Sequence, residues 1–168
     1  FLDFGAYRNG RWLAFWIAGT SWSIFASEDD LIRAWSSAPQ SCNRARFYLF
    51  RRTYNFHMKR DAQTMAIWVS FPELPPPFQI PSILRMLGNM VGRLLCSDSR
   101  TSSVCHPISP RFCVEIDVSK LPVDFVWIVV GEEFRCKQNV VFDHWVDFCS
   151  SCKRLGHLMV VCRRGQRT

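Results

Sequence analysis

Four residues near the C-terminal end of the chain have the types and spacing of a metal site. Cys149, Cys152, His157 and Cys162 form the pattern Cys-x2-Cys-x4-His-x4-Cys. At the cysteine and histidine frequencies of this chain, such a pattern arises by chance in roughly 4 of 10,000 sequences. Three thiolates and one imidazole suit Zn²⁺, which takes four ligands in a tetrahedron. Because protein fills all four positions, the pattern predicts one structural zinc ion and leaves no place for a catalytic water.

The residues between the ligands fit this interpretation. Two residues between Cys149 and Cys152 allow a turn that points both sulfurs at one place, and Gly156 can take the positive φ that a reversal before His157 needs. A segment this short cannot bury a core, so metal binding must supply its folding free energy, about 10–16 kcal/mol in zinc-finger peptides. Cys105, His106 and His144 are spaced irregularly, so no second metal site is expected.

Charge is distributed unevenly along the 168 residues. The net charge of +7 divides into +5 over residues 1–60, −3 over residues 61–147 and +5 over residues 148–168, where no acidic residue occurs. Clustered positive charge attracts polyanions. We therefore expect single-stranded nucleic acid as a partner, with the phosphates contacted by Lys153, Arg154, Arg163 and Arg164. Charge alone leaves open the alternative of a solvated face with a basic tail.

A second candidate surface lies in a predicted strand of the N-terminal third. Alternation places Arg46, Tyr48, Phe50 and Arg52 on one face of this strand. Aromatic rings between cations are what a sheet that stacks bases would use. The favoured interpretation is nevertheless structural, with the strand buried on both faces and the arginines at its ends.

The remaining pattern predicts the elements that position these residues. Ser27 followed by three acidic residues predicts the start of a helix that Pro39 closes, and apolar spacing predicts a second helix from Pro81 to about Met90, with Met86 and Met90 in the core. The predicted strands are 22–26, 46–52, 66–71, 93–97, 112–117, 125–130 and 135–142. This order predicts an α+β fold, an antiparallel sheet with two helices, followed by the metal-binding segment.

The expected parts are a strand–helix–strand region over residues 1–63, a strand–helix–strands region over 64–145, the metal-binding segment over 146–164 and a tail over 165–168.

No phosphate-binding glycine loop, Ser-His-Asp arrangement or carboxylate pair is apparent in the sequence, and Glu115 and Asp117 are expected to be solvated charges, so we predict no enzymatic activity. The uncharged stretch from Trp12 to Ser27 is too short and too polar to predict a membrane span. Since the chain begins at Phe1, it is expected to be a piece of a longer protein.

Several stretches resemble one plant family, the domain of unknown function 4283, together with its companion zinc knuckle. The stretches that carry the resemblance are 27–31, 67–75, 83–92, 112–120 and 148–162, whereas Trp12 to Thr20 does not resemble the family. Members of this family look like first-reading-frame proteins of plant non-LTR retrotransposons, or host genes derived from them. The resemblance implies a non-enzymatic, nucleic-acid-binding protein of the nucleus or cytoplasm, with an RRM-like or ferredoxin-like sheet.

Carried onto this sequence, the knuckle ligands are the same four residues. Viral-type knuckles often carry an aromatic residue after the first cysteine, where this chain has Ser150, so Leu158 is left as the apolar contact for a base. An alternative function is a protein-interaction module, since Met159, Val160 and Val161 are unusually apolar for a surface that meets only phosphates.

Overall fold

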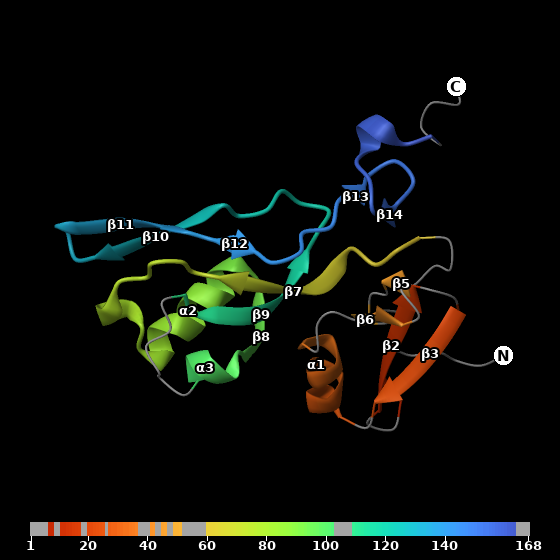
Figure 1. The fold of residues 1–168 in the computed structure, drawn as a ribbon, viewed down its shortest axis with the longest axis horizontal. Helices are drawn as coiled ribbons and strands as arrows, with labels where there is room; N and C mark the ends of the chain where they lie inside the picture. The colour runs from red at the N-terminus through yellow and green to blue at the C-terminus, as the bar shows by residue number, and fades with distance from the viewer. Residues whose placement is uncertain are drawn as a thin grey trace. The chain divides into compact units, whose positions relative to one another are not determined.

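The chain forms an α+β structure in two compact units (Figure 1). The computed structural model describes residues 7–8, 11–17, 20–25, 27–36, 41–42, 45–46, 49–51, 60–102 and 109–163. The first unit comprises Phe1–Ala66, Asp117–Ser119 and Val146–Thr168, and the second comprises Ile67–Ile116 and Lys120–Trp145. The predicted fold class, with antiparallel sheets and two main helices, is confirmed. No helix in the described part of the chain is long and apolar enough to span a membrane.

The first unit contains a sheet near the N-terminus in which each strand pairs antiparallel with its neighbour. Its strands are β1 (Tyr7–Arg8), β2 (Arg11–Ile17), β3 (Thr20–Phe25) and β6 (Leu49–Arg51), and a separate hairpin joins β4 (Ser41–Cys42) to β5 (Ala45–Arg46). The central strand β2 is not predicted from the sequence. Its run of residues from Arg11 to Ile17 does not alternate between apolar and polar types, which removes the usual strand signature.

The predicted strand from Arg46 to Arg52 is wrong as a single element. Arg46 ends β5, whose partner is β4, whereas Phe50 lies in β6, whose partner is β2 in another sheet. Tyr48 and Arg52 lie outside the described residues. Of the proposed aromatic and basic stripe, Arg46 and Phe50 thus lie in different strands, and the stripe itself stays a prediction.

The helix α1 (Glu28–Ser36) begins where the sequence predicts. The Ser27 hydroxyl oxygen accepts a hydrogen bond from the backbone N–H of Asp30 at 3.1 Å, and the hydroxyl donates to the Asp30 carboxylate at 2.9 Å. This side-chain cap satisfies one of the free amides at the start of the helix. Leu31 and Trp35, one turn apart, are its buried residues.

The second unit is built on a four-stranded sheet with the order β12-β7-β9-β8. Its strands are β7 (Thr64–Ser70), β8 (Arg93–Ser97), β9 (Arg111–Asp117) and β12 (Val141–Phe142). The pairs β12–β7 and β8–β9 are antiparallel. A backbone hydrogen bond from Phe71 to Pro110 and another from Val118 to Gln63 join opposite ends of β7 and β9, so this pair is antiparallel as well.

The helix α2 (Pro81–Val91) packs on this sheet through Leu84, Leu87 and Val91. The prediction that Met86 and Met90 belong to the core is wrong, because their exposed fractions are 64% and 52%. At about 100° per residue, Met86 and Met90 lie about 130° and 90° around the helix from the centre of the stripe formed by the three buried residues. The core that the helix completes consists of Val69, Phe71, Leu74, Phe78, Leu84, Leu87, Val91, Phe112, Val114, Val126, Ile128 and Val140.

The turn from α2 into β8 requires a residue without a side chain. A Cβ at Gly92 would lie 2.7 Å from the backbone oxygen of Glu115 in the neighbouring strand. The next residue, Arg93, forms an ion pair with the Glu115 carboxylate at 3.3 Å. Only 12% of the Glu115 side chain is exposed, so the expectation that it is a solvated charge is wrong.

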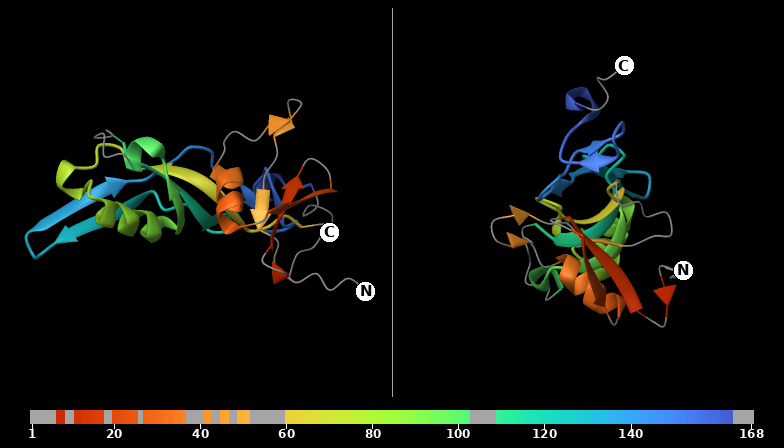
Figure 2. Two further views of the ribbon diagram at one scale, coloured as in Figure 1. Left: turned by 90° about the horizontal axis from the view of Figure 1, so that it is seen from below. Right: turned by 90° about the vertical axis from the view of Figure 1, so that its right-hand side faces the viewer.

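A long hairpin follows β9 and lies beside α2 in Figure 1 and in the left-hand view of Figure 2. It consists of β10 (Phe125–Val130) and β11 (Phe134–Asn139), joined by a turn in which Gly131 has a φ of 63°. The prediction of one strand from residue 135 to 142 is wrong, because β11 ends at Asn139 and β12 pairs with β7. The buried Gln138 amide donates to the carbonyl of Pro72 at 2.7 Å and thereby fastens the hairpin to the loop after β7.

Candidate metal centre

The metal-binding segment begins with a short antiparallel hairpin of the first unit. Strands β13 (Phe148–Cys149) and β14 (Arg154–Leu155) pair with Cys149 opposite Arg154. The turn between them is closed by a hydrogen bond at 2.9 Å from the backbone N–H of Lys153 to the carbonyl of Cys149. Lys153 has a φ of 58°, a left-handed conformation that non-glycine residues adopt at a cost.

The chain then reverses twice to complete the site. Gly156 has a φ of 92°, as its position before His157 predicts, and its N–H donates to the carbonyl of Asp147 at 2.8 Å. A single turn of 3-10 helix, η2 (Met159–Val161), leads to Cys162, whose N–H donates to the carbonyl of Met159 at 3.1 Å. The two reversals bring residues of the second half of the segment back to the hairpin.

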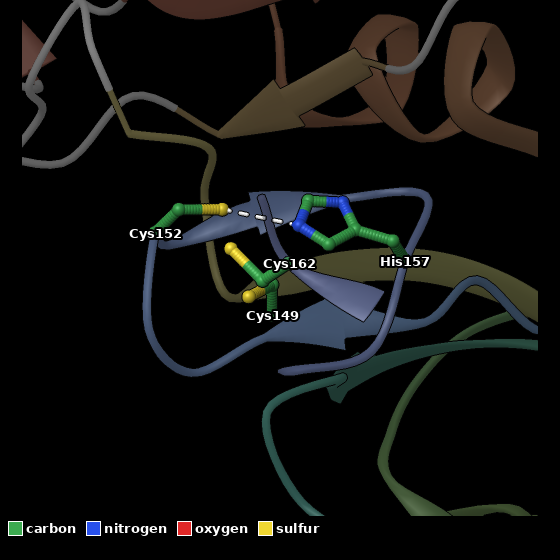
Figure 3. A group of neighbouring side chains, drawn as sticks. All are labelled: Cys149, Cys152, His157 and Cys162. Carbon is green, nitrogen blue, oxygen red and sulfur yellow. Dashed lines mark hydrogen bonds between the residues drawn. The ribbon is translucent and has the colours of Figure 1, made fainter. Parts of the chain in front are cut away.

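The side chains of the four predicted ligands converge on one point (Figure 3). Their three sulfur atoms and one imidazole nitrogen all lie within 4.8 Å of one another. The Cys152 sulfur is 3.3 Å from Nε2 of His157, so Nε2 is the nitrogen that faces the cluster. A tetrahedral zinc ion with Zn–S bonds of about 2.3 Å would hold sulfurs about 3.8 Å apart. The four residues therefore have the spacing to hold one metal ion.

Burial divides the ligands into two pairs. Cys149 and Cys162 are fully buried at the base of the segment, whereas Cys152 and His157 are half-buried. Desolvation raises the pKa of the Cys152 thiol above its ordinary value, and hydrogen bonds with the thiols of Cys149 and Cys162 raise it further. The backbone N–H of Arg154 opposes this rise because it donates to the sulfur. Without a cation, these effects favour the protonated form of the Cys152 thiol.

An aspartate far away in the sequence fixes this hairpin. The Asp61 carboxylate accepts a hydrogen bond from the backbone N–H of Leu155 at 2.9 Å, and the Asp61 N–H donates to the carbonyl of Lys153 at 2.9 Å. Both partners lie in the turn and strand between two of the ligands. Asp61 is not predicted as a site residue, and with 87 or more residues between it and the ligands, no spacing rule could identify it.

A hollow of about 310 Å³ lies over the cluster, and basic residues line it. Its lining residues are Cys152, Arg154, His157, Val161, Cys162 and Arg163. Of the predicted nucleic-acid contacts, Arg154 and Arg163 are therefore brought together at the metal ligands, and Leu158 is 53% exposed. Lys153 is half-buried in the hairpin turn, and Arg164 lies outside the described residues.

The other cysteines and histidines do not add to this cluster within the described residues. Cys105 and His106 lie outside them, while His144 is exposed. Cys113 is a buried residue of β9, opposite Cys96 in β8, and a hydrogen bond with the Cys96 thiol together with desolvation raises its pKa. No family model matches the chain, and no curated protein or solved structure matches it either.

We expect Gly156→Ala to weaken zinc binding about 5- to 30-fold. A Cβ at this position meets no atom within 4 Å, so the cost comes from the positive φ, about 1–2 kcal/mol for a residue with a side chain. The measurement is competition with a chromophoric zinc chelator. Gly131→Ala is the matched control, since Gly131 also has positive φ and open space but lies in the β10–β11 turn. Equal zinc affinity of the two variants would contradict this prediction.

We expect Asp61→Ala to weaken zinc binding about 5- to 30-fold, because the Leu155 amide loses a charged acceptor worth about 1–2 kcal/mol. Asp61→Asn retains an acceptor oxygen and should stay within about threefold of the wild type. Asp124→Ala, which removes an exposed carboxylate before β10, controls for charge and should leave the affinity unchanged. If the asparagine variant loses as much affinity as the alanine variant, the negative charge matters and the hydrogen bond does not.

Zinc affinity should rise steeply with pH. Zinc binds cysteine as the thiolate, so binding releases thiol protons, and the raised pKa of Cys152 makes the release of its proton more costly. The apparent affinity should fall about 1,000-fold between pH 7.5 and 6.5, which corresponds to about three protons released per zinc ion. A pH indicator in weakly buffered solution measures this release directly. Release of one proton or none would show that the thiols are not the ligands.

Proposed function

We propose that this chain is a zinc-dependent, non-enzymatic protein that binds single-stranded RNA or DNA with little sequence preference. The observation that carries the proposal is the hollow over the metal ligands, which Arg154 and Arg163 line together. Two guanidinium groups beside a fixed cluster can bind phosphate oxygens with several donors each. In this proposal zinc is the resident ion, since three sulfurs and one imidazole nitrogen form a donor set that it prefers.

The charge of the segment favours a polyanion as its ligand. Three thiolates around Zn²⁺ carry a net charge of about −1, which the surrounding lysine and arginines exceed. No acidic residue occurs between Phe148 and the C-terminus, so no carboxylate in this stretch repels phosphates. The exposed Leu158 supplies an apolar surface for a base, although a poorer one than an aromatic ring.

The second unit supports a finer proposal about the fold. Its elements run β7, α2, β8, β9, hairpin and β12, and its sheet has the order β12-β7-β9-β8. An RRM-like or ferredoxin-like sheet has the same order of four strands, with a second helix between the third and fourth. We propose that this unit is a variant of that plan in which the β10–β11 hairpin takes the place of the second helix.

We also retain the proposed kinship with the plant domain of unknown function 4283 and its zinc knuckle, and hence an origin in a retrotransposon reading frame and a location in the nucleus or cytoplasm. The resemblance of residues 148–162 is its main support, because the four ligands of the knuckle pattern lie together in the structure.

A second candidate function is contact with a protein partner through the segment. Leu158, Met159, Val160 and Val161 are all more than half exposed, and four consecutive exposed apolar residues form a small contact patch. The Ser150 hydroxyl lies 3.4 Å from the Met159 sulfur, which fixes one side of this patch. This candidate makes the apolar residues, rather than the arginines, the determinants of binding.

The proposal is tested by fluorescence anisotropy of the zinc-loaded chain with labelled single-stranded oligonucleotides over a series of salt concentrations. With four phosphates neutralised, the log–log slope should be about −3. The double variant K153N/R154Q should reduce the magnitude of the slope, from about −3 to about −1.5, and weaken binding about 10- to 30-fold at 0.1 M salt. Asparagine is chosen at position 153 because it tolerates the positive φ better than most residues.

The control R85Q/K120Q removes two exposed cations from the second unit and should leave the slope unchanged. Native mass spectrometry checks that each variant holds one zinc ion. A wild-type slope near zero would contradict the proposal. Oligonucleotide binding that survives K153N/R154Q but is lost in M159S or V161S would contradict the phosphate-contact role of the two basic residues.

A further inference from the structure

The β10–β11 hairpin presents aromatic and basic side chains on one of its faces. In the antiparallel register, Phe125 pairs with Asn139, Trp127 with Lys137, and Val129 with Arg135. Directly opposed residues of an antiparallel pair lie on the same face. These six residues, which we call the hairpin face, are all exposed.

Packing of the opposite face determines which side of the hairpin faces solvent. Val126 and Ile128 belong to the core of the second unit, and Gln138 on the partner strand is buried and hydrogen-bonded to Pro72. A hairpin anchored in this way cannot turn over without exposing those side chains. The hairpin face is therefore a fixed surface.

The two rings of the hairpin face differ in what they contact. The Phe125 and Trp127 ring centroids are 6.0 Å apart, with their planes at 85°, and the Lys137 ammonium lies 4.2 Å from the centre of the Phe125 ring. The Trp127 side chain is 54% exposed. An indole held by a ring edge but open to solvent is a stacking platform for a base.

The charge of this face matches a polyanion. Arg135 and Lys137 are its only charged residues, and no carboxylate pairs with either of them within the described part of the chain. Glu132 and Glu133 lie in the turn at the tip, and Asp124 precedes β10, so acidic residues flank the face at both ends. They restrict phosphate contact to the strands between them.

The four-stranded sheet offers no comparable surface. The Trp68 ring is covered by the Arg111 guanidinium at 4.6 Å, and Arg111 is in turn paired with the Asp143 carboxylate. A protein-binding face would also be possible for exposed aromatics, but protein interfaces are depleted of lysine at their centres. Lys137 stands directly opposite Trp127, in the middle of this face.

We propose that the hairpin face is a second binding site for single-stranded nucleic acid, with Trp127 stacking on a base and Lys137 and Arg135 contacting phosphates. This inference rests on the proposed function and adds to it a second site on another unit. Sequence preference should be weak, because every base offers a face for stacking.

The test uses the zinc-loaded full chain and labelled oligouridine and oligothymidine of about 20 nucleotides. Trp127→Leu removes the ring but retains apolar area, and it should weaken binding about 5- to 150-fold, while Trp127→Phe retains most of the affinity. The double variant R135Q/K137Q should lower the magnitude of the salt slope by about 1.4. Tryptophan fluorescence quenching by the oligonucleotide should be reduced in Trp127→Phe.

The controls are Leu121→Ala, an exposed apolar residue away from the face, and R85Q on α2, and neither should change the affinity. Unchanged binding of Trp127→Leu would overturn the inference. Self-association of the wild type without nucleic acid, lost in Trp127→Leu on light scattering, would overturn it as well and assign the face to a second copy of the chain.

Combining the hairpin variant with K153N/R154Q separates this inference from the proposed function. If only the knuckle variant loses affinity, the knuckle proposal stands and the hairpin site is rejected. If only Trp127→Leu loses affinity, the hairpin site stands and the knuckle proposal is rejected. If the wild type binds neither oligonucleotide, both are rejected.

Discussion

The close approach of three sulfur atoms and one imidazole nitrogen is the constraint on which the C-terminal segment depends. Three thiolates confined within 4.8 Å would repel one another, so a cation bound between them would stabilise this arrangement. Within the described residues of the segment, the buried side chains are those of Phe148, Cys149 and Cys162. The side chains of its final turn, Leu158 to Val161, face solvent, and its 3-10 helix has no buried residue. Coordination of a metal ion by the four residues would take the role that a hydrophobic core has elsewhere in the chain.

The fold could be predicted where one periodicity dominates a segment. Strands β8 and β10 have the predicted bounds, and the helix after Pro81 differs by one residue at its end. Prediction failed where the outcome depends on distant partners. Met86 and Met90 have helical spacing, but only the neighbouring sheet decides which stripe of α2 is buried. The break between β11 and β12 likewise depends on the pairing of β12 with β7. The local sequence from residue 134 to 142 carries no signal for that distant partner.

The candidate site divides in the same way. All four ligands could be identified from the sequence, because a chelating motif within 14 residues is a local property. Asp61 could not, since its role depends on a backbone amide of Leu155 that meets it only in the folded chain. The sequence predicts β10 as a strand, but alternation alone does not tell which of its two faces is exposed. In the structure, Val126, Ile128 and Gln138 are buried, so the face that carries Phe125 and Trp127 is the exposed one.

The two hydrogen bonds of Asp61 make the metal-binding segment dependent on the rest of the first unit. The residues just after Asp61 are themselves held, because the carbonyl of Gln63 accepts the Val118 amide at 2.8 Å at the end of β9. Part of the entropy of ordering the ion-binding loop is thus lost before any ion arrives. The metal-binding segment is consequently not independent of its surroundings. If it were grafted onto a foreign protein without Asp61, metal coordination alone would have to offset the conformational entropy lost when the segment becomes ordered.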